Sequence, residues 1–443
     1  MGIKRREGMK LFKFISLIIM LTLMLSVLSG CNSSVKVSNE KNDALSKVKN
    51  IEEVKEYLKN NFTEINLEKE NEFQNLAVLN DDLKDKEIFF TGENHGIKTN
   101  ELLDMKFLRY FKEKVDFKYY LCELSYSDAY FLNKYLESGD IKILENIYKP
   151  LKGTFAWNKE SYDHWKKVYE FNKTLPQDRK IQVVGVDIEH QIENALRYMT
   201  TVLPNKEVPN EITSKISELN NTWTSIENIK ENINPKKLVD FSEGLRKDLK
   251  EKEGIYKNYL GENYLGFKLV NDNILYTNEA YSARDNEFNK VRDKRIYENF
   301  KNIYDNLPKG KYYGQWGLNH IFQKDQAGVK WVAAAMNEKG SSLENKVLSI
   351  AYIYENCEFM NKTSDRSYSI ANINTNNSNV LNDITTKDCT MFKLNGKDSP
   401  FSKNLIWITS DNIPKRGVTT DYYQYLILVK NSQATEPLND RYN

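Results

Sequence analysis

Short apolar runs, rich in β-branched and aromatic residues, recur along the chain from Lys86 onward, and most are bounded by Gly, Asn, Asp or charged residues. Runs of this length and composition are typical of β-strands. Stretches with helical spacing separate the early runs, as in 100–115 and 161–175. Near-continuous apolar strands that alternate with helices favour an α/β fold with a largely parallel central sheet covered by helices. The predicted strands are 86–92, 117–124, 181–187, 311–317, 346–354 and 423–430.

Three other stretches depart from this alternation. Residues 205–305 are highly charged and helical in spacing, so we predict a helical insertion or subdomain between the third and fourth strands. Residues 358–395 are rich in Asn, Ser and Thr, which predicts a long surface excursion. Residues 46–62 have apolar positions at the spacing of a short amphipathic helix.

The N-terminus has the pattern of an export signal. Basic residues precede an uncharged run from Ile15 to Leu28, which is too short for a comfortable membrane span. The run ends in Leu28-Ser29-Gly30-Cys31, which resembles a bacterial lipobox, and cleavage at a lipobox leaves the cysteine as the lipidated first residue. We therefore expect Cys31 to carry a lipid anchor that holds the protein on the outer face of the cell membrane. A plain secretory signal with an incidental cysteine is the alternative.

These patterns divide the chain into a signal peptide 1–30, a polar tether with an N-terminal helix 31–80, and an α/β domain 81–440 that contains the helical insertion. The 64 basic and 62 acidic residues nearly balance, so nothing in the charge favours a nucleic-acid partner.

Three cysteines remain besides Cys31, and none of them forms a CxxC pair or a zinc-like cluster. Cys122 lies in an apolar run and is interpreted as a small core residue. Cys357 and Cys389 are candidates for a disulfide, because exported proteins meet oxidising conditions. The sequence leaves open whether these two residues approach each other.

Polar side chains follow four of the predicted strands at the point where each strand ends. Glu93 and His95 follow the first strand, Glu123 ends the second, Asp187 ends the third, and His320 follows the fourth. In open α/β sheets ligands bind at the carboxyl ends of the strands. The sequence therefore predicts a site at this edge of the sheet.

Two kinds of chemistry are open to this set of residues. Glu93 and His95 point to the same side if strand geometry continues past the first run, and a carboxylate beside a histidine favours a general base. Together with Glu123 and His320 they are also a candidate ligand set for a divalent metal ion, although no HxxH or HExxH pair is present. No GxSxG motif occurs, which argues against a covalent acyl-enzyme. His164 lies inside a predicted helix and is interpreted as a packing histidine.

Six motifs of the chain, in their order and rough spacing, resemble those of erythromycin-esterase-like proteins, over residues 80 to 438. That family looks like part of a wider group that includes the ChaN haem-uptake proteins and the TraB/Tiki proteases. The six motifs are "TGENHG", "CELSYSDAYFLNKYL", "TFAWNKESYDHWKKVYEFN", "VVGVDIEH", "VRDKRIYENFKNIYDNLPKGKYYGQWGLNH" and "DYYQYLILVKNSQATEPL".

The resemblance implies that His95 is a base, with Glu93 and Glu123 as its carboxylate partners and His320 as the second histidine of the site. The late motif usually reads HNxH in the family, whereas here it reads GLNH, so Gly317 stands in the place of the first histidine. We expect substrate contacts from four further residues of these motifs. They are Asp187, Trp157, Arg292 and Asn319.

We therefore expect a surface-anchored hydrolase in which His95 activates water for attack on an ester or related acyl bond of a small-molecule substrate. Because members of the family open macrolide lactones, antibiotic resistance is one expected role. One alternative is a metal-dependent hydrolase or protease of the TraB/Tiki kind, with Glu93, His95, Glu123 and His320 as ligands of a divalent metal ion. Another is a non-catalytic haem-binding protein, as in the ChaN group.

Overall fold

The structure is a computed structural model that describes part of the chain. The described residues are 51–438, except 230–233, 285–286, 363–367, 376–377, 379–380, 382–383, 386 and 411. The expected signal peptide 1–30, the lipidation site Cys31 and the tether as far as residue 50 lie outside the described residues. No helix among the described residues is long and apolar enough to cross a membrane.

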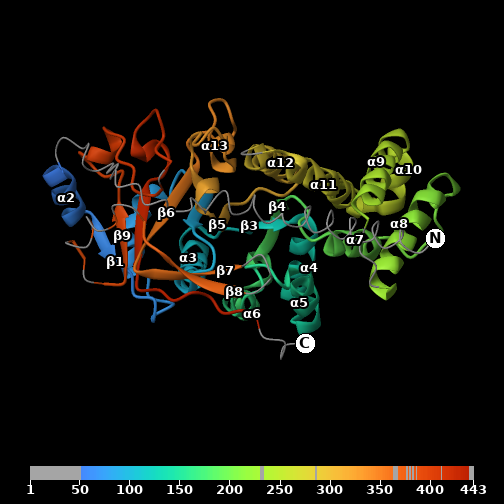
Figure 1. The fold of residues 1–443 in the computed structure, drawn as a ribbon, viewed down its shortest axis with the longest axis horizontal. Coiled ribbons are helices and arrows are strands. Elements are labelled where there is room, and N and C mark those ends of the chain that lie inside the picture. Colours follow the sequence, from blue (N-terminus) through green and yellow to red (C-terminus); the bar gives the residue numbers. More distant parts are fainter. Residues whose placement is uncertain are drawn as a thin grey trace, which may run out of the picture.

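A mostly parallel sheet forms the centre of the protein, which confirms the predicted fold class (Figure 1). Within the described residues it has eight strands in the order β1-β9-β10-β6-β2-β5-β3-β4. The six strands from β10 to β4 run parallel to one another, and β9 is antiparallel to both of its neighbours. All six predicted strands are present. The strands are β1 Phe62–Glu64, β2 Ile88–Glu93, β3 Tyr119–Ser125, β4 Gln182–Asp187, β5 Tyr312–Gly317, β6 Val347–Glu355, β9 Cys389–Lys393 and β10 Tyr425–Lys430.

Helices cover both faces of the sheet because successive side chains of each strand point to opposite faces. In β2, Phe89 belongs to one hydrophobic cluster and stacks on Phe111, with the ring centroids 4.7 Å apart. Ile88 and Phe90 belong to the other cluster, with Phe300. The first cluster includes side chains of α3 Lys98–Val115, α4 Tyr126–Ser138, α5 Ile141–Tyr148 and α6 Lys159–Thr174. The second includes side chains of α2 Ile51–Asn60, α12 Glu287–Tyr304 and α13 Val332–Met336.

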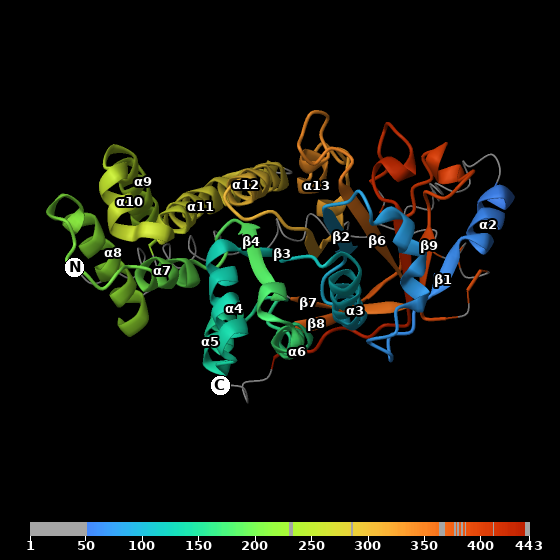
Figure 2. The same cartoon turned by 180° about the vertical axis from the view of Figure 1, so that it is seen from behind.

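Helices gather at one end of the molecule, opposite β1 and β9 (Figures 1 and 2). No strand occurs among the described residues of 205–305, as the charged helical pattern predicts. The division of the chain into domains stays a prediction. The helix α12 returns from this end to the carboxyl end of β4, where it delivers Arg292 and Asp293. The helices of this region are α7 Ile192–Thr201, α8 Asn210–Ile229, α9 Pro235–Glu251, α10 Glu253–Leu260, α11 Tyr264–Ser282 and α12.

One expectation about the C-terminal part of the chain is wrong, and one question that the sequence left open is answered. The predicted surface excursion 358–395 contains the hairpin of β7 Cys357–Lys362 and β8 Tyr368–Ile373, and it ends in the sheet strand β9. The side chains of β9 are buried and pair with β10, so the polar composition around β9 concealed a strand of the core. The disulfide considered between Cys357 and Cys389 is absent, since both cysteines are free and buried, and the Cys357 thiol donates to the carbonyl of Val429 (3.4 Å).

Candidate active site

The carboxyl ends of four neighbouring strands, β2, β5, β3 and β4, bring the predicted polar residues together. Glu93 ends β2, Glu123 lies near the end of β3, and Asp187 ends β4. His320 lies in the short helix η5 Leu318–Ile321, which follows β5 directly. Because these strands are parallel and adjacent, residues that are distant in the sequence meet at one edge of the sheet.

The Glu93–His95 pair lies in the turn that joins β2 to α3. The Glu93 carboxylate contacts Nδ1 of His95 and accepts a hydrogen bond from the Asn100 amide (2.5 Å). Gly96 turns the chain with φ +85°, and a Cβ there would meet the backbone of the β7 strand at 2.6 Å, so the turn requires glycine. The ring of Phe155 stacks on the imidazole, with the centroids 4.9 Å apart. The histidine is thus oriented by one carboxylate and one aromatic ring.

His95 keeps one nitrogen free for chemistry. Nδ1 is occupied by Glu93, whereas Nε2 makes no hydrogen bond to any part of the chain that the structure describes. The surrounding protein lowers the pKa of His95 by desolvation, but the charge and the hydrogen bond of Glu93 outweigh this effect and raise the pKa to about 9. The side chain is 38% exposed, so the imidazole can be reached from solvent.

The guanidinium of Arg292 joins two buried carboxylates on the opposite side of the site. Its Nε donates to Asp187 (3.0 Å), and its Nη2 donates to Glu123 (2.6 Å) and also contacts Asp187. Burial raises the pKa of Glu123, but the charges of His320 and Arg292 have a larger, opposite effect and lower the pKa to about 2. The same balance between burial and Arg292 holds the pKa of Asp187 below its usual range. Both carboxylates are therefore ionised at neutral pH.

His320 has partners at both ring nitrogens. Nδ1 donates to Asp293 (2.9 Å), which also accepts the backbone N–H of Val332 (2.9 Å). Nε2 lies 3.2 Å from Nη1 of Arg292 and 3.4 Å from the Glu123 carboxylate. Burial lowers the pKa of His320, but the charges of Asp293 and Glu123 raise it above the ordinary value. This histidine is fixed in place by partners at both ring nitrogens.

Gly317 lies at the point where the two halves of the site face each other. A Cβ built on Gly317 would lie 3.4 Å from each of three atoms: Nε2 of His95, Oε2 of Glu123 and Cδ2 of His320. Any two of these three atoms are therefore separated by no more than twice 3.4 Å. The N–H of Gly317 donates to Glu123 (2.7 Å), so the glycine also orients this carboxylate. Gly317 therefore leaves room for no more than a small group beside these three atoms.

Of the other predicted site residues, Trp157 is part of the hydrophobic core and Asn319 lies beside His320. Trp157 is buried and belongs to the main hydrophobic cluster, whereas Phe155, two residues earlier in the same motif, is the ring that contacts His95. Asn319 is half-buried beside His320. Sequence reasoning did not single out Phe155 or Asn100, and it named Asp293 only as part of a motif, without a role in the site. Asp293 directly follows Arg292, and Asn100 opens the amphipathic stretch after the first motif, so both had a weak signal.

The four residues Glu93, His95, Glu123 and His320 do not fit a shared divalent metal ion. The guanidinium of Arg292 already lies against Glu123 and beside Nε2 of His320. A metal ion bound by these two residues would have to displace a positive charge or lie in contact with it. The metal-dependent alternative is therefore not supported by the geometry.

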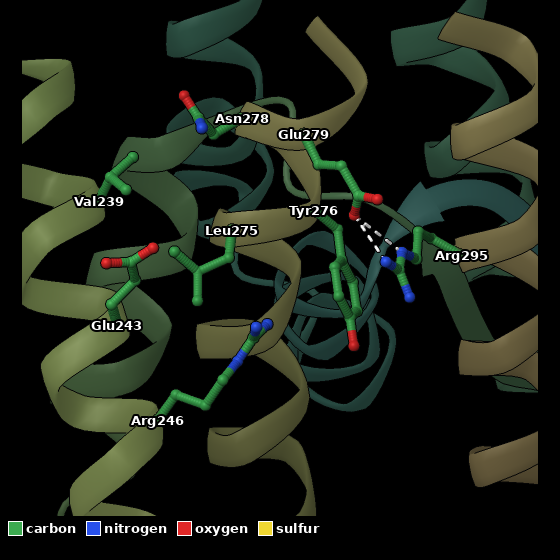
Figure 3. Close-up of a pocket in the computed structure, with 8 residues that line it drawn as sticks. All are labelled: Val239, Glu243, Arg246, Leu275, Tyr276, Asn278, Glu279 and Arg295. Carbon is green, nitrogen blue, oxygen red and sulfur yellow. Dashed lines mark hydrogen bonds and ion pairs between the residues drawn. The ribbon is translucent and has the colours of Figure 1, made fainter. Parts of the chain in front are cut away.

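A separate open hollow of about 400 Å³ lies among α9, α11 and α12 (Figure 3). Its two arginines are already paired: Arg295 donates to Glu279 at 2.7 and 3.0 Å, and Arg246 donates to Asp272 at 2.7 Å. None of the predicted site residues lines it. This hollow therefore plays no part in the candidate active site.

Comparison with known proteins shows the fold. No protein-family model matches the chain, and no curated protein sequence matches it. A crystal structure of a Bacillus cereus protein is 16% identical, covers 88% of this chain and 99% of its own, and has a TM-score of 0.67. A succinoglycan biosynthesis protein is 14% identical, with coverage of 88% and 98% and a TM-score of 0.64. A mutant of the erythromycin esterase EreC in its open conformation is also 14% identical, with coverage of 85% and 99% and a TM-score of 0.64.

Proposed function

We propose that this chain is a hydrolase of the erythromycin-esterase-like class, in which His95 activates water for attack on an ester or related acyl bond. The observation that carries the proposal is the free Nε2 of His95, which faces Glu123 and His320 across Gly317. The fold shared with an erythromycin esterase and the six sequence motifs support the same class. The substrate is a small molecule that reaches the half-exposed side of the site.

The roles follow from the hydrogen bonds. Glu93 holds the proton of His95 on Nδ1, so Nε2 is the nitrogen that accepts a proton from water. The water oxygen then attacks the acyl carbon, and the bond to the leaving oxygen breaks as that oxygen takes up the proton held on Nε2 of His95. His320, with Arg292 beside it, is placed to stabilise the negative charge that develops on the acyl oxygen. Glu123 orients both Arg292 and the Gly317 backbone.

The experiment is a hydrolysis assay of the purified protein on p-nitrophenyl esters and on macrolide lactones. We expect His95→Ala to reduce turnover by about 10²- to 10⁴-fold, the range lost with a general base. The thermal melt should change little above about pH 9, where the Glu93–His95 interaction no longer adds stability. Glu113→Gln, an exposed change on α3, is the matched control and should keep full activity. Full activity of His95→Ala on a substrate that the wild type cleaves would refute the proposal.

We further propose that the protein acts at the outer face of the cell membrane through a lipid on Cys31. The support is the sequence pattern that ends in Leu28-Ser29-Gly30-Cys31. Cys31→Ala should move the protein from the membrane fraction to the soluble fraction, as read by fractionation and immunoblotting. Unchanged membrane association of this variant would contradict the anchor.

A further inference from the structure

A second group of polar residues lies between α3 and α6, close enough to the Glu93–His95 pair for Glu101 to interact with both charges. Glu101 and Asp104 are one turn apart on α3, and His164 comes from α6. One ligand atom from each of the three residues lies within 4.8 Å of the other two. The proposed hydrolase mechanism uses none of these three residues.

The carboxylates of this group have no basic side chain as a partner. Neither Glu101 nor Asp104 forms an ion pair with a lysine or arginine within the described part of the chain; their only basic neighbour at ion-pair distance is His164. The buried Asp104 accepts hydrogen bonds from two tyrosine hydroxyls, those of Tyr313 (2.7 Å) and Tyr120. Both donors are phenol hydroxyls, which carry no charge at neutral pH. Buried carboxylates normally have a cation or a metal ion beside them.

The imidazole of His164 points an unsatisfied nitrogen into the same group. His164 is 5% exposed, and its Nδ1 has no hydrogen-bond partner among the described residues. The nearest carboxylate oxygen, Oε2 of Glu101, lies 3.6 Å from Nδ1, which is too far for a hydrogen bond. A buried nitrogen without a partner requires an explanation, and an ion is one of the few available. This nitrogen is an observation independent of the two acidic residues.

We propose that Glu101, Asp104 and His164 bind one divalent transition-metal ion, for which Zn²⁺ is the best match. Zinc accepts imidazole nitrogen and carboxylate oxygen together, whereas calcium and magnesium prefer oxygen ligands alone. Ligand atoms arranged as a tetrahedron about 2.1 Å from zinc are about 3.4 Å apart, close to the 3.6 Å between Nδ1 of His164 and Oε2 of Glu101. The Asp104 carboxylate lies 3.4 Å from the other ring nitrogen, Nε2, so it must turn toward Nδ1 when the ion binds.

The Glu101 side chain is 24% exposed, so the ion has a route from solvent. The bound ion would tie α3 to α6. Because Asn100, which orients Glu93, lies next to Glu101, it would also fix the helix turn that supports His95. This inference does not rest on the proposed hydrolase activity.

The test is a titration of the full-length protein, stripped with a chelator, with Zn²⁺ by calorimetry and with Co²⁺ by visible absorption. We expect one equivalent to bind, and zinc to raise the thermal melting temperature by mass action. Glu101→Gln should weaken binding by about 100-fold or more, because loss of even an outer-shell partner costs 10- to 100-fold. Glu113→Gln, an exposed carboxylate on the same helix, is the matched control and should bind like the wild type.

His164→Ala should abolish binding and the shift in melting temperature. If this buried substitution prevents folding, the half-buried Glu101→Gln variant decides the question alone. Absence of a bound equivalent in the wild type, or unchanged affinity in Glu101→Gln, would overturn the proposal. Loss of binding in His95→Ala with full binding in Glu101→Gln would also overturn it, because the ion would then belong to the active site. Each of these readouts is independent of ester hydrolysis.

Discussion

The two halves of the candidate active site each contain a histidine held by a carboxylate, yet they differ in burial and in the number of partners. His95 is 38% exposed and keeps Nε2 free, whereas His320 is 7% exposed and has partners at both nitrogens. A free and accessible nitrogen can exchange a proton with water or substrate, and a fully engaged one can only stabilise charge. The difference therefore assigns proton transfer to the first half and positioning to the second.

The two halves also depend on the fold to different extents. The Glu93–His95 pair lies within three residues of one turn, and its orientation needs only Asn100 and Phe155 in addition. The buried half is assembled from β3, β4, η5 and α12 around Arg292. Changes in the buried half should therefore affect stability, and changes in the exposed half should affect catalysis.

The largest expected effect in this comparison comes from Arg292→Met. Removal of the guanidinium leaves Glu123 and Asp187 buried and ionised without their main counter-ion, which should cost about 3–5 kcal/mol of unfolding free energy. Denaturant unfolding followed by circular dichroism measures the loss. Arg295→Met on the same helix is the matched control, since its carboxylate partners are exposed and such pairs contribute about 1 kcal/mol or less. Equal losses of unfolding free energy in the two variants would show that the buried half of the site adds no special stability.

The pH dependence of hydrolysis should show the next largest effect. A general base acts in its neutral form, and a pKa of about 9 leaves about 1% of His95 neutral at pH 7. We therefore expect kcat/KM to rise with pH by about 100-fold between pH 7 and a plateau above pH 9. Glu93→Gln removes the negative charge that raises the pKa of His95, so the increase in kcat/KM should occur at lower pH. A profile in Glu93→Gln that coincides with the wild type would exclude His95 as the titrating base.

The raised pKa of His95 also makes the stability of the folded protein depend on pH. The pKa of His95 is raised by folding above its ordinary 6.5, so the Glu93–His95 interaction contributes its full stability below about pH 6.5. This contribution is lost as the pH rises through about 9. The difference in unfolding free energy between the wild type and His95→Gln, measured across this range, should shrink as the pH increases.

The sequence predicted the strands that carry the site residues but not the buried ion pairs of Arg292. The strands that carry Glu93, Glu123 and Asp187 were predictable, because apolar runs of five to nine residues with polar ends are local patterns, and parallel strands bring their ends together. Arg292 was expected to contact the substrate, whereas its side chain is buried in ion pairs with residues 105 and 169 positions away. Such pairing depends on how α12 crosses the sheet, which no local pattern specifies.

A change at Gly317 probes the space between the two halves. Its backbone, at φ −53° and ψ 136°, accepts any residue, and a Cβ would make ordinary contacts at 3.4 Å. Gly317→Ala should therefore keep the fold and most of the activity. Gly317→Leu should occupy the position beside Nε2 of His95 and raise KM by about tenfold, which corresponds to about 1.4 kcal/mol of binding free energy. Steady-state kinetics check this, and an unchanged KM in the leucine variant would show that substrate does not bind at this position.

The smallest expected effect comes from removing the Phe155 ring that stacks on His95. Phe155→Ala removes the ring that stacks on the imidazole, and aromatic stacking of this kind contributes about 0.5–1.5 kcal/mol. We expect kcat/KM to fall by about 2- to 10-fold. Phe155→Tyr should retain the stack and the activity, while Phe155→Leu keeps bulk without the aromatic face and should resemble the alanine variant. If leucine restored full activity, Phe155 would act only by filling space, and Glu93 alone would orient the catalytic histidine.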